Sequence, residues 1–400
     1  MRLIRLAPAI VLLGTLAGAP PTSSLAPIPL LMANGVARQQ PAPGTPVGAL
    51  AASVTDLGYR MRTLAGDGNW VASPLSVAYA FAMVRAGAGG STRAAIDRTF
   101  GFSDDVDAAF NGATAQIATA STPGKRNSDR PTVCITNGLF VQRGLPVGRP
   151  FLDTLASQYG TGVHPVDFGS GDAARTINEW VRQQTAGKIK QGYDPGGNDV
   201  LVLANTVYLR ADWVHPFRLT AAEPFHAPQG TVDVPTMRLA AELPYASGDG
   251  WQSVDLPYAG SDLVMRLLIP ASGGDPAALL QRRVPAAPAQ SRRLELHLPK
   301  WTFSSAADLR KLGPPELFGP GADLNGITAG ATITKAKHQA YIAVDEKGTE
   351  AAAASTIAFA TSAEIPPPLV VRADRPFAFA IVHKPTGIPL FVGRVTDPGS

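Results

Sequence analysis

The stretch that most constrains the fold is a proline-free, almost uncharged segment near the carboxyl end of this 400-residue chain. From Gly348 to Ala363 it contains no proline, and after Glu350 no charged residue follows until Glu364. Three consecutive prolines, 366–368, then close it. A segment that keeps every backbone donor and carries almost no charge can be buried as a central strand, but a proline triplet cannot join a central ladder. We therefore expect a strand whose pairing ends before the prolines.

The two faces of this segment differ. In a strand, alternate residues share a face. One face is small and uncharged at its leading end and consists of Thr349, Ala351, Ala353, Ser355, Ile357 and Phe359. The opposite face consists of Glu350, Ala352, Ala354, Thr356, Ala358 and Ala360. The run of four alanines also favours a helix, so the residues alone leave open a surface helix ending near Ser355.

The amino-terminal end has the pattern of an export signal. Arg2 and Arg5 precede an apolar run, Leu6–Leu16, and the small residues 17–19. This run is too short to span a bilayer. We expect a signal peptide over residues 1–19, cut after Ala17 or further on because Pro20 follows; an uncleaved anchor or a mis-assigned start is the alternative. Residues 20–46 are rich in Pro, Ala and Gly, which predicts a flexible linker, and residues 47–400 then form a single domain.

Charge and motifs exclude several functions. The formal charge is +4, but residues 1–38 hold three arginines and no acidic residue, so the rest carries 4 − 3 = +1. A nucleic-acid binder would keep a basic excess. The six histidines show no metal-ligand spacing, and no nucleophile elbow, phosphate loop or dinucleotide fingerprint occurs. We therefore expect no metal, no cofactor and no enzyme activity. The single cysteine, Cys134, cannot form an internal disulfide.

Helical spacing is clearest early in the domain. Leu50, Val54, Leu57 and Met61 predict an amphipathic helix. The run Leu75–Ala86 is apolar nearly all round, which predicts a helix buried on every side. Ser73 can cap that helix and Pro74 suits its first turn. Ser73 thus has a structural role, which leaves little reason to assign it as a hydrolase nucleophile.

Several segments in unbroken order resemble one family. They are residues 69–102, Asn137 and Phe140 in an Asn-x-x-Phe pattern, residues 205–209, Leu298-Pro299-Lys300, the acidic-Lys-Gly-Thr-Glu-Ala segment at 345–355, and the ending Leu-Phe-Val-Gly-Arg-Val at 390–395. Together they resemble an inhibitory serpin, of a secreted bacterial kind, over about residues 50 to 398. The resemblance implies an α+β serpin fold with three β-sheets, about eight or nine helices and an exposed reactive-centre loop at about 346–368.

The resemblance also implies roles for individual residues. It assigns a hinge to Glu346, Lys347, Gly348, Thr349, Glu350, Ala351, Ala352, Ala353, Ala354 and Ser355. It assigns a polar cluster beneath the opening sheet, the shutter, to Ser73, Ser76, Asn205 and His338, and it places Trp213 at the loop's entry point, the breach. The family's usual spacing from Glu346 puts the reactive bond between Ser362 and Ala363. An alignment on the residues before the prolines instead puts the cut after Ala363.

The function implied is suicide inhibition of serine proteases by a monomer. A small residue at the cut suits elastase-like or subtilisin-like enzymes, and a cut at Phe359 would suit a chymotrypsin-like one. The absence of Lys and Arg from Gly348 to Val371 argues against trypsin-like targets. Lys125, Arg126 and Arg130 form only a small basic group where the family binds glycosaminoglycans, so we expect no strong site there. A non-inhibitory carrier or chaperone and a secreted hydrolase are the alternatives.

Overall fold

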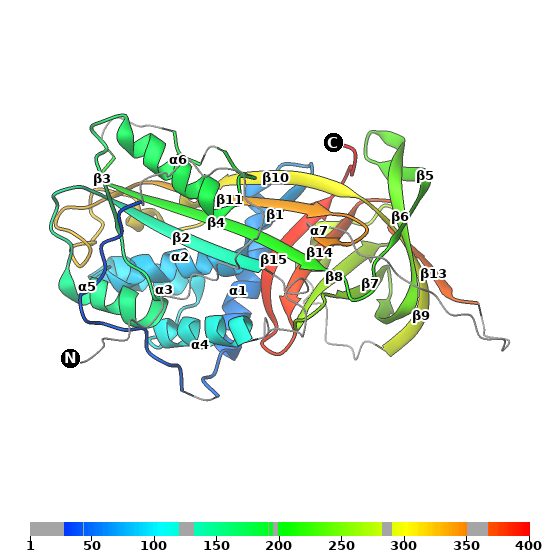
Figure 1. Ribbon diagram of the computed structural model, residues 1–400, viewed down its shortest axis with the longest axis horizontal. Helices are drawn as coiled ribbons and strands as arrows, with labels where there is room; N and C mark the ends of the chain where they lie inside the picture. The colour runs from blue at the N-terminus through cyan, green and yellow to red at the C-terminus, as the bar shows by residue number, and fades with distance from the viewer. Residues whose placement is uncertain are drawn as a thin grey trace, which may run out of the picture.

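The computed structural model describes residues 28–42, 44–119, 132–190, 192–194, 199–281, 290–349 and 367–400, and the structural statements below concern these residues. A six-stranded sheet forms the middle of the molecule in Figure 1. The helix α6 covers one of its faces and α2 the other, and both contact the strands β2 and β4. A larger sheet continues to one side.

Two helices were predicted from the sequence, and both are present. The first two confirm the predicted helices: Leu50, Val54, Leu57 and Met61 are buried on α1, and α2 is buried over most of its length. Ser73 caps α2 by accepting a hydrogen bond from the Ser76 backbone N–H. The α-helices are α1 (Gly48–Met61), α2 (Pro74–Ala86), α3 (Gly90–Phe100), α4 (Val106–Thr119), α5 (Arg149–Thr154), α6 (Asp172–Gln184) and α7 (Pro276–Gln281).

The described ranges hold seven α-helices, slightly fewer than the eight or nine expected. Single turns of other helix types extend or separate them, and two of these turns flank Pro314. Prolines at 314 and 315 remove two N–H donors, which keeps this region from forming a longer helix. The short turns are η1 (Arg62–Leu64), η2 (Leu155–Tyr159), η3 (Leu309–Lys311) and η4 (Pro315–Leu317).

The six-stranded sheet carries the hinge. Its strand order is β10-β11-β12-β4-β2-β3. The two long strands β11 and β4 are parallel and pair directly over part of their length, with His338 opposite Asn205. The strands are β10 (Trp301–Asp308), β11 (Ile333–Val344), β12 (Gly348–Thr349), β4 (Leu201–Asp212), β2 (Thr132–Gln142) and β3 (His164–Val166).

The second sheet has nine strands, whereas the family resemblance implied three sheets in all. The reason is β6, which is 19 residues long and pairs with β5 and β9 before its end pairs with β7. Hydrogen bonding is therefore continuous through β6, and the described residues form two sheets rather than three. The strands are β1 (Trp70–Ala72), β15 (Ile388–Val395), β14 (Phe377–His383), β8 (Leu263–Pro270), β7 (Trp251–Pro257), β6 (Gly230–Gly248), β9 (Gln290–Pro299), β13 (Leu369–Arg372) and β5 (Arg218–Ala227).

The segment before α1 differs from the predicted flexible linker. Residues 28–42 lie along the domain, as the dark blue trace in Figure 1 shows. Leu31 exchanges two backbone hydrogen bonds with Val163, of 2.7 and 3.0 Å, and the Gln39 N–H donates to the Ser157 carbonyl at 2.8 Å. The Asn111 amide donates to the Gln39 carbonyl. Specific backbone partners, which composition does not reveal, hold this segment in place.

No helix in the described ranges has both the length and the apolar character needed to cross a membrane.

Candidate functional site: the hinge and the sheet beneath it

The hinge begins inside the sheet. Gly348 and Thr349 form β12, which lies between β11 and β4 and is antiparallel to both. Thr349 is opposite Val344 on one side and Ala211 on the other, and its side chain is buried. Beyond these residues β11 and β4 pair with each other. The first two residues of the predicted inserting segment therefore already occupy the space between the strands that would have to separate.

A tight turn directs the chain into this position. The Asp345 carboxylate accepts hydrogen bonds from the N–H groups of Lys347 (2.9 Å) and Gly348 (3.2 Å), and the Asp345 N–H donates to the Gly348 carbonyl at 3.0 Å. Gly348 also approaches β4 very closely: a Cβ atom there would lie 2.0 Å from the Ala211 carbonyl oxygen. Only glycine fits this approach.

Trp213, the predicted breach residue, holds the turn. Its indole N–H donates to the Asp345 carbonyl at 3.0 Å, and its backbone N–H donates to the Lys347 carbonyl at 2.7 Å. The ring stacks on Tyr258 with centroids 4.5 Å apart. The Tyr258 hydroxyl is in turn hydrogen-bonded to the Thr349 hydroxyl at 2.7 Å. Burial raises the pKa of Tyr258, although the Thr349 bond acts against that rise, so the phenol stays neutral and keeps its proton for this bond.

An ion pair fixes the start of the hinge from the other side. The Lys300 ammonium lies 3.0 Å from both carboxylate oxygens of Glu346. The Glu346 carbonyl accepts from the Phe217 backbone N–H at 2.7 Å. Both charged side chains are half-buried, so the pair is screened less than a fully exposed one.

The four predicted shutter residues do meet beneath the hinge. The His338 Nε2 accepts from the Ser73 N–H at 3.0 Å, and its Nδ1–H donates to the Asn205 side-chain oxygen. The Asn205 amide nitrogen donates to the Ser76 carbonyl at 2.8 Å and to its hydroxyl at 2.6 Å. All four side chains are buried. Because His338 is on β11 and Asn205 on β4, their bond crosses the gap that insertion would open.

Burial also fixes the charge of the cluster. It lowers the pKa of His338 to about 3, so the ring is neutral near pH 7. A neutral ring carries one proton, and the acceptor role of Nε2 assigns that proton to Nδ1. Each ring nitrogen therefore has one defined partner, and His338 acts structurally.

Some predicted positions lie outside the described residues. This holds for the reactive bond Ser362–Ala363, for the remaining hinge residues Glu350, Ala351, Ala352, Ala353, Ala354 and Ser355, and for the basic group Lys125, Arg126 and Arg130. Within the described part of the chain, no group of three or more His, Cys, Asp or Glu side chains is arranged to hold a metal ion.

Sequence reasoning missed three contributors. Asn137 joins the shutter from β2, where it lies opposite Asn205 and accepts from its amide. Tyr258, the residue after β7, and Lys300, the residue before β10, both hold the hinge. The only sequence signals were the Asn-x-x-Phe and Leu-Pro-Lys patterns, and neither one indicated which residues it would contact.

The fold and this site place the start of the predicted loop, β12, between two long strands of one sheet, and comparison with known proteins identifies the family. A family model described as Serpin (serine protease inhibitor) matches residues 51–398. An uncharacterised serpin-like protein from Thermococcus kodakarensis is 33% identical over 365 residues, which cover 84% of this chain and 83% of that protein. Leukocyte elastase inhibitor A from Mus musculus is 32% identical over 363 residues, covering 83% and 93%.

Among solved structures, that of the thermophilic serpin tengpin in its native state has a TM-score of 0.78 at 21% identity. The matched region covers 92% of this chain and 97% of the tengpin chain. Human glycosylated kallistatin has a TM-score of 0.74 at 28% identity, with coverage of 89% and 99%. The chain belongs to the serpin family, whose members are generally protease inhibitors rather than enzymes.

Proposed function

We propose that this protein inhibits serine proteases as a suicide substrate, by inserting its cut loop into the six-stranded sheet. The observation that carries the proposal is β12: Gly348 and Thr349 already lie between β11 and β4.

The observed register predicts where the rest of the segment would go. Thr349 is opposite Ala211 and Val344, so each further residue would advance one position along β4 and one along β11. Continued for six residues, this places Ser355 opposite both Asn205 and His338. The two partner strands give the same answer independently. Insertion would therefore replace the direct His338–Asn205 bond with contacts to a small polar side chain.

The length and the side chains suit this path. Residues 350–362 would span about 43 Å as a strand, close to the roughly 40 Å of the 12-residue strands β4 and β11. Thr349 points inward, so Ala351, Ala353 and Ser355 would follow it on the buried face. Small side chains can pass between separating strands with little rearrangement.

The proposed chemistry belongs to the protease. Its serine oxygen would attack the Ser362 carbonyl carbon, the peptide bond would break, and the Ala363 nitrogen would leave with a proton as a free amine. An ester would then link Ser362 to the protease. New ladder hydrogen bonds and burial of the apolar face would drive insertion, and the displaced protease would lose the geometry needed to hydrolyse that ester.

The target class and location form part of this proposal. A cut after Ser362 presents a small side chain, which fits elastase-like or subtilisin-like proteases, whereas Phe359 would fit a chymotrypsin-like enzyme. The basic start and apolar run of residues 1–19 support export and action outside the cell.

The test is to mix the protein with an elastase-like and a subtilisin-like protease and to analyse the products on a denaturing gel. We expect a covalent band of summed mass, and mass spectrometry of that band should identify the new carboxyl end at Ser362. Cleavage without any covalent band would overturn inhibition, and turnover of a test ester would point to a hydrolase.

One observation favours a second function, that of a small-molecule carrier. A largely apolar cavity of about 500 Å³ lies between α1, α7 and the strands β8, β14 and β15, with Tyr59, Arg266 and Lys384 among its lining residues. One structural neighbour, 26% identical, is a thyroxine-binding globulin in complex with thyroxine. The test is calorimetric titration with a fluorescent apolar acid. Saturable binding that Leu268→Trp abolishes would support this role, and lack of binding would exclude it.

A further inference from the structure

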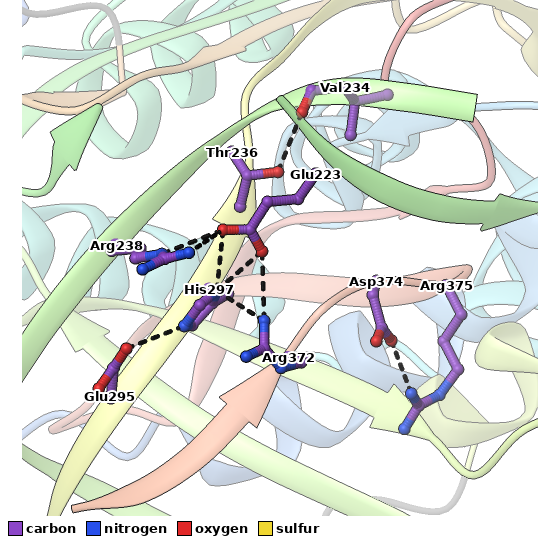
Figure 2. A network of polar contacts seen from close by, with 9 residues as sticks. All are labelled: Glu223, Val234, Thr236, Arg238, Glu295, His297, Arg372, Asp374 and Arg375. Carbon is purple, nitrogen blue, oxygen red and sulfur yellow. Dashed lines mark hydrogen bonds and ion pairs between the residues drawn. The ribbon is translucent and has the colours of Figure 1, made fainter. Parts of the chain in front are cut away.

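The strand after the reactive segment is held at a sheet edge by one polar cluster. β13 contains only four residues and pairs with β9 alone, with Arg372 opposite His297. Leu369 and Val370 are exposed, so Arg372 supplies the strand's polar side-chain tie to the sheet. Figure 2 shows Arg372 reaching His297 on β9 and Glu223 on β5.

Three groups approach the two nitrogens of His297. Arg372 Nη1 lies 2.8 Å from Nδ1, and Glu223 Oε2 lies 2.9 Å from the same Nδ1. Glu295 Oε1 lies 3.1 Å from Nε2. The imidazole side chain is 3% exposed, so water cannot readily replace these partners.

The two contacts at Nδ1 exclude each other chemically. A guanidinium only donates, so the Arg372 contact requires an unprotonated Nδ1. A carboxylate only accepts, so the Glu223 contact requires a protonated Nδ1. With Nε2–H donating to Glu295 in both cases, the Arg372 bond belongs to the neutral ring and the Glu223 bond to the charged ring.

We propose that His297 is a proton-operated latch on β13, which holds Arg372 when the ring is neutral and releases it in favour of Glu223 when the ring is protonated. In the neutral state Arg372 bonds both Nδ1 and, at 3.2 Å, Glu223. In the charged state it loses the first bond and faces a second positive charge. Acidification from pH 8 to pH 5 therefore tests whether protonation of the ring loosens β13.

The surrounding charges come from every strand in the cluster. Glu223 on β5 also accepts from Arg238 on β6, at 2.7 and 3.0 Å, and Glu295 is on β9 itself. Burial opposes ionisation of Glu223, but hydrogen bonds from His297 and Arg238 hold the pKa of its carboxylate below the usual glutamate value. Glu223 thus stays negative across this range.

The latch regulates the proposed insertion, and this consequence rests on the proposed function. Seventeen residues, 350–366, join β12 to Pro367. If residues 350–362 entered the sheet without a cut, Ser362 would lie about 43 Å from the hinge. The four residues 363–366, about 13 Å of extended chain, would then have to return over that distance to Pro367. Uncut insertion therefore requires β13 to leave β9, so a held β13 preserves the active inhibitor and a released β13 allows it to inactivate itself.

The test is hydrogen–deuterium exchange of the full uncut chain at pH 7.5 and 5.5, corrected for the intrinsic effect of pH on exchange. We expect the protection of the amides of residues 371–373 to fall about tenfold at pH 5.5, the effect of losing one charge-assisted hydrogen bond. His297→Gln should remove this fall, because its amide can accept from Arg372 at every pH. The control His226→Gln changes an exposed histidine on β5 whose ring contacts the Thr231 hydroxyl, and it should keep the fall, because the bond from its backbone N–H to the Asp374 carbonyl is retained.

Wild-type protein whose β13 amides show no pH dependence would overturn the latch, as would an equal fall in His297→Gln. If that variant does not fold, nitrogen NMR of wild-type protein with labelled histidines decides the matter. The latch requires an unprotonated Nδ1 on His297 at pH 8. It also requires that protonation of this nitrogen coincides with the loss of β13 protection. Neither readout uses a protease, so failure of the latch and failure of inhibition are separate results.

Discussion

Arginine in place of Thr349 should turn the inhibitor into a substrate. Thr349 is 1% exposed, and its hydroxyl is bonded to the buried Tyr258 hydroxyl at 2.7 Å. The substitution removes that bond and requires a guanidinium to enter a buried position whose ladder partners, Val344 and Ala211, are apolar. Losing the bond costs about 1 kcal/mol, and burying the unpaired charge adds several more.

In the uncut variant the hinge would avoid these costs by leaving the sheet, and insertion would have to bring the arginine at position 349 back between β11 and β4. A penalty of at least about 3 kcal/mol on insertion then slows it by roughly a hundredfold or more. Hydrolysis of the ester would then precede insertion, while docking and cutting would remain unchanged. On a denaturing gel, we expect the covalent fraction to fall from most of the protein to a few per cent, with cleaved protein in its place. Thr349→Val, which removes the hydroxyl alone, should cause only a partial loss.

The matched control is Leu145→Arg, which adds the same charge at a residue 37% exposed in the turn after β2. It should leave the covalent fraction at the wild-type level. If Thr349→Arg also formed a full covalent complex, inhibition would not require residue 349 to be buried between β11 and β4, and the reasoning from β12 would be refuted.

Three further predictions follow from neighbouring contacts. Gly348→Ala places a Cβ atom 2.0 Å from the Ala211 carbonyl oxygen, so it should expel the hinge from the sheet and increase proteolysis of the uncut loop, and unchanged digestion kinetics would contradict this. Lys300→Ala leaves the Glu346 carboxylate unpaired and should lower the apparent Tm of the uncut protein by a few degrees, about 1 kcal/mol, while Glu346→Gln added to it should restore part of the loss. The folded-state pKa of His338 is about 3, below the ordinary 6.5, so the unfolded chain takes up the proton first as the pH falls. The free energy of unfolding should therefore decrease below pH 6.5, by about 2 kcal/mol at pH 5. Urea unfolding should show a smaller loss between pH 7 and pH 5 in His338→Gln than in the wild type.

Much of this site could be predicted because its residues carry local signals. The proline-free segment was compatible with a buried strand, the family resemblance favoured that strand over a helix, and Thr349 does point inward between β11 and β4. Ser73 and Pro74 marked the start of a buried helix, and that helix is α2. In each case the property that determines the structure belongs to neighbouring residues.

The rest depends on partners that lie far apart in the sequence. Tyr258 meets Thr349 across 91 residues, and Lys300 meets Glu346 across 46. No pattern around either residue indicates its partner. The same reason explains residues 28–42, whose composition predicts a flexible linker but whose backbone pairs with Val163 and Ser157. The continuous path of β6 between two groups of strands likewise follows from tertiary pairing.

The most direct test of loop insertion is the heat stability of the protein before and after one cut between Ser362 and Ala363. Thirteen residues gaining ladder partners on both sides should add on the order of 10 kcal/mol, which predicts an unfolding temperature at least about 10 °C higher for the cut protein. An unfolding temperature that stays the same, or falls, after this cut would contradict the account.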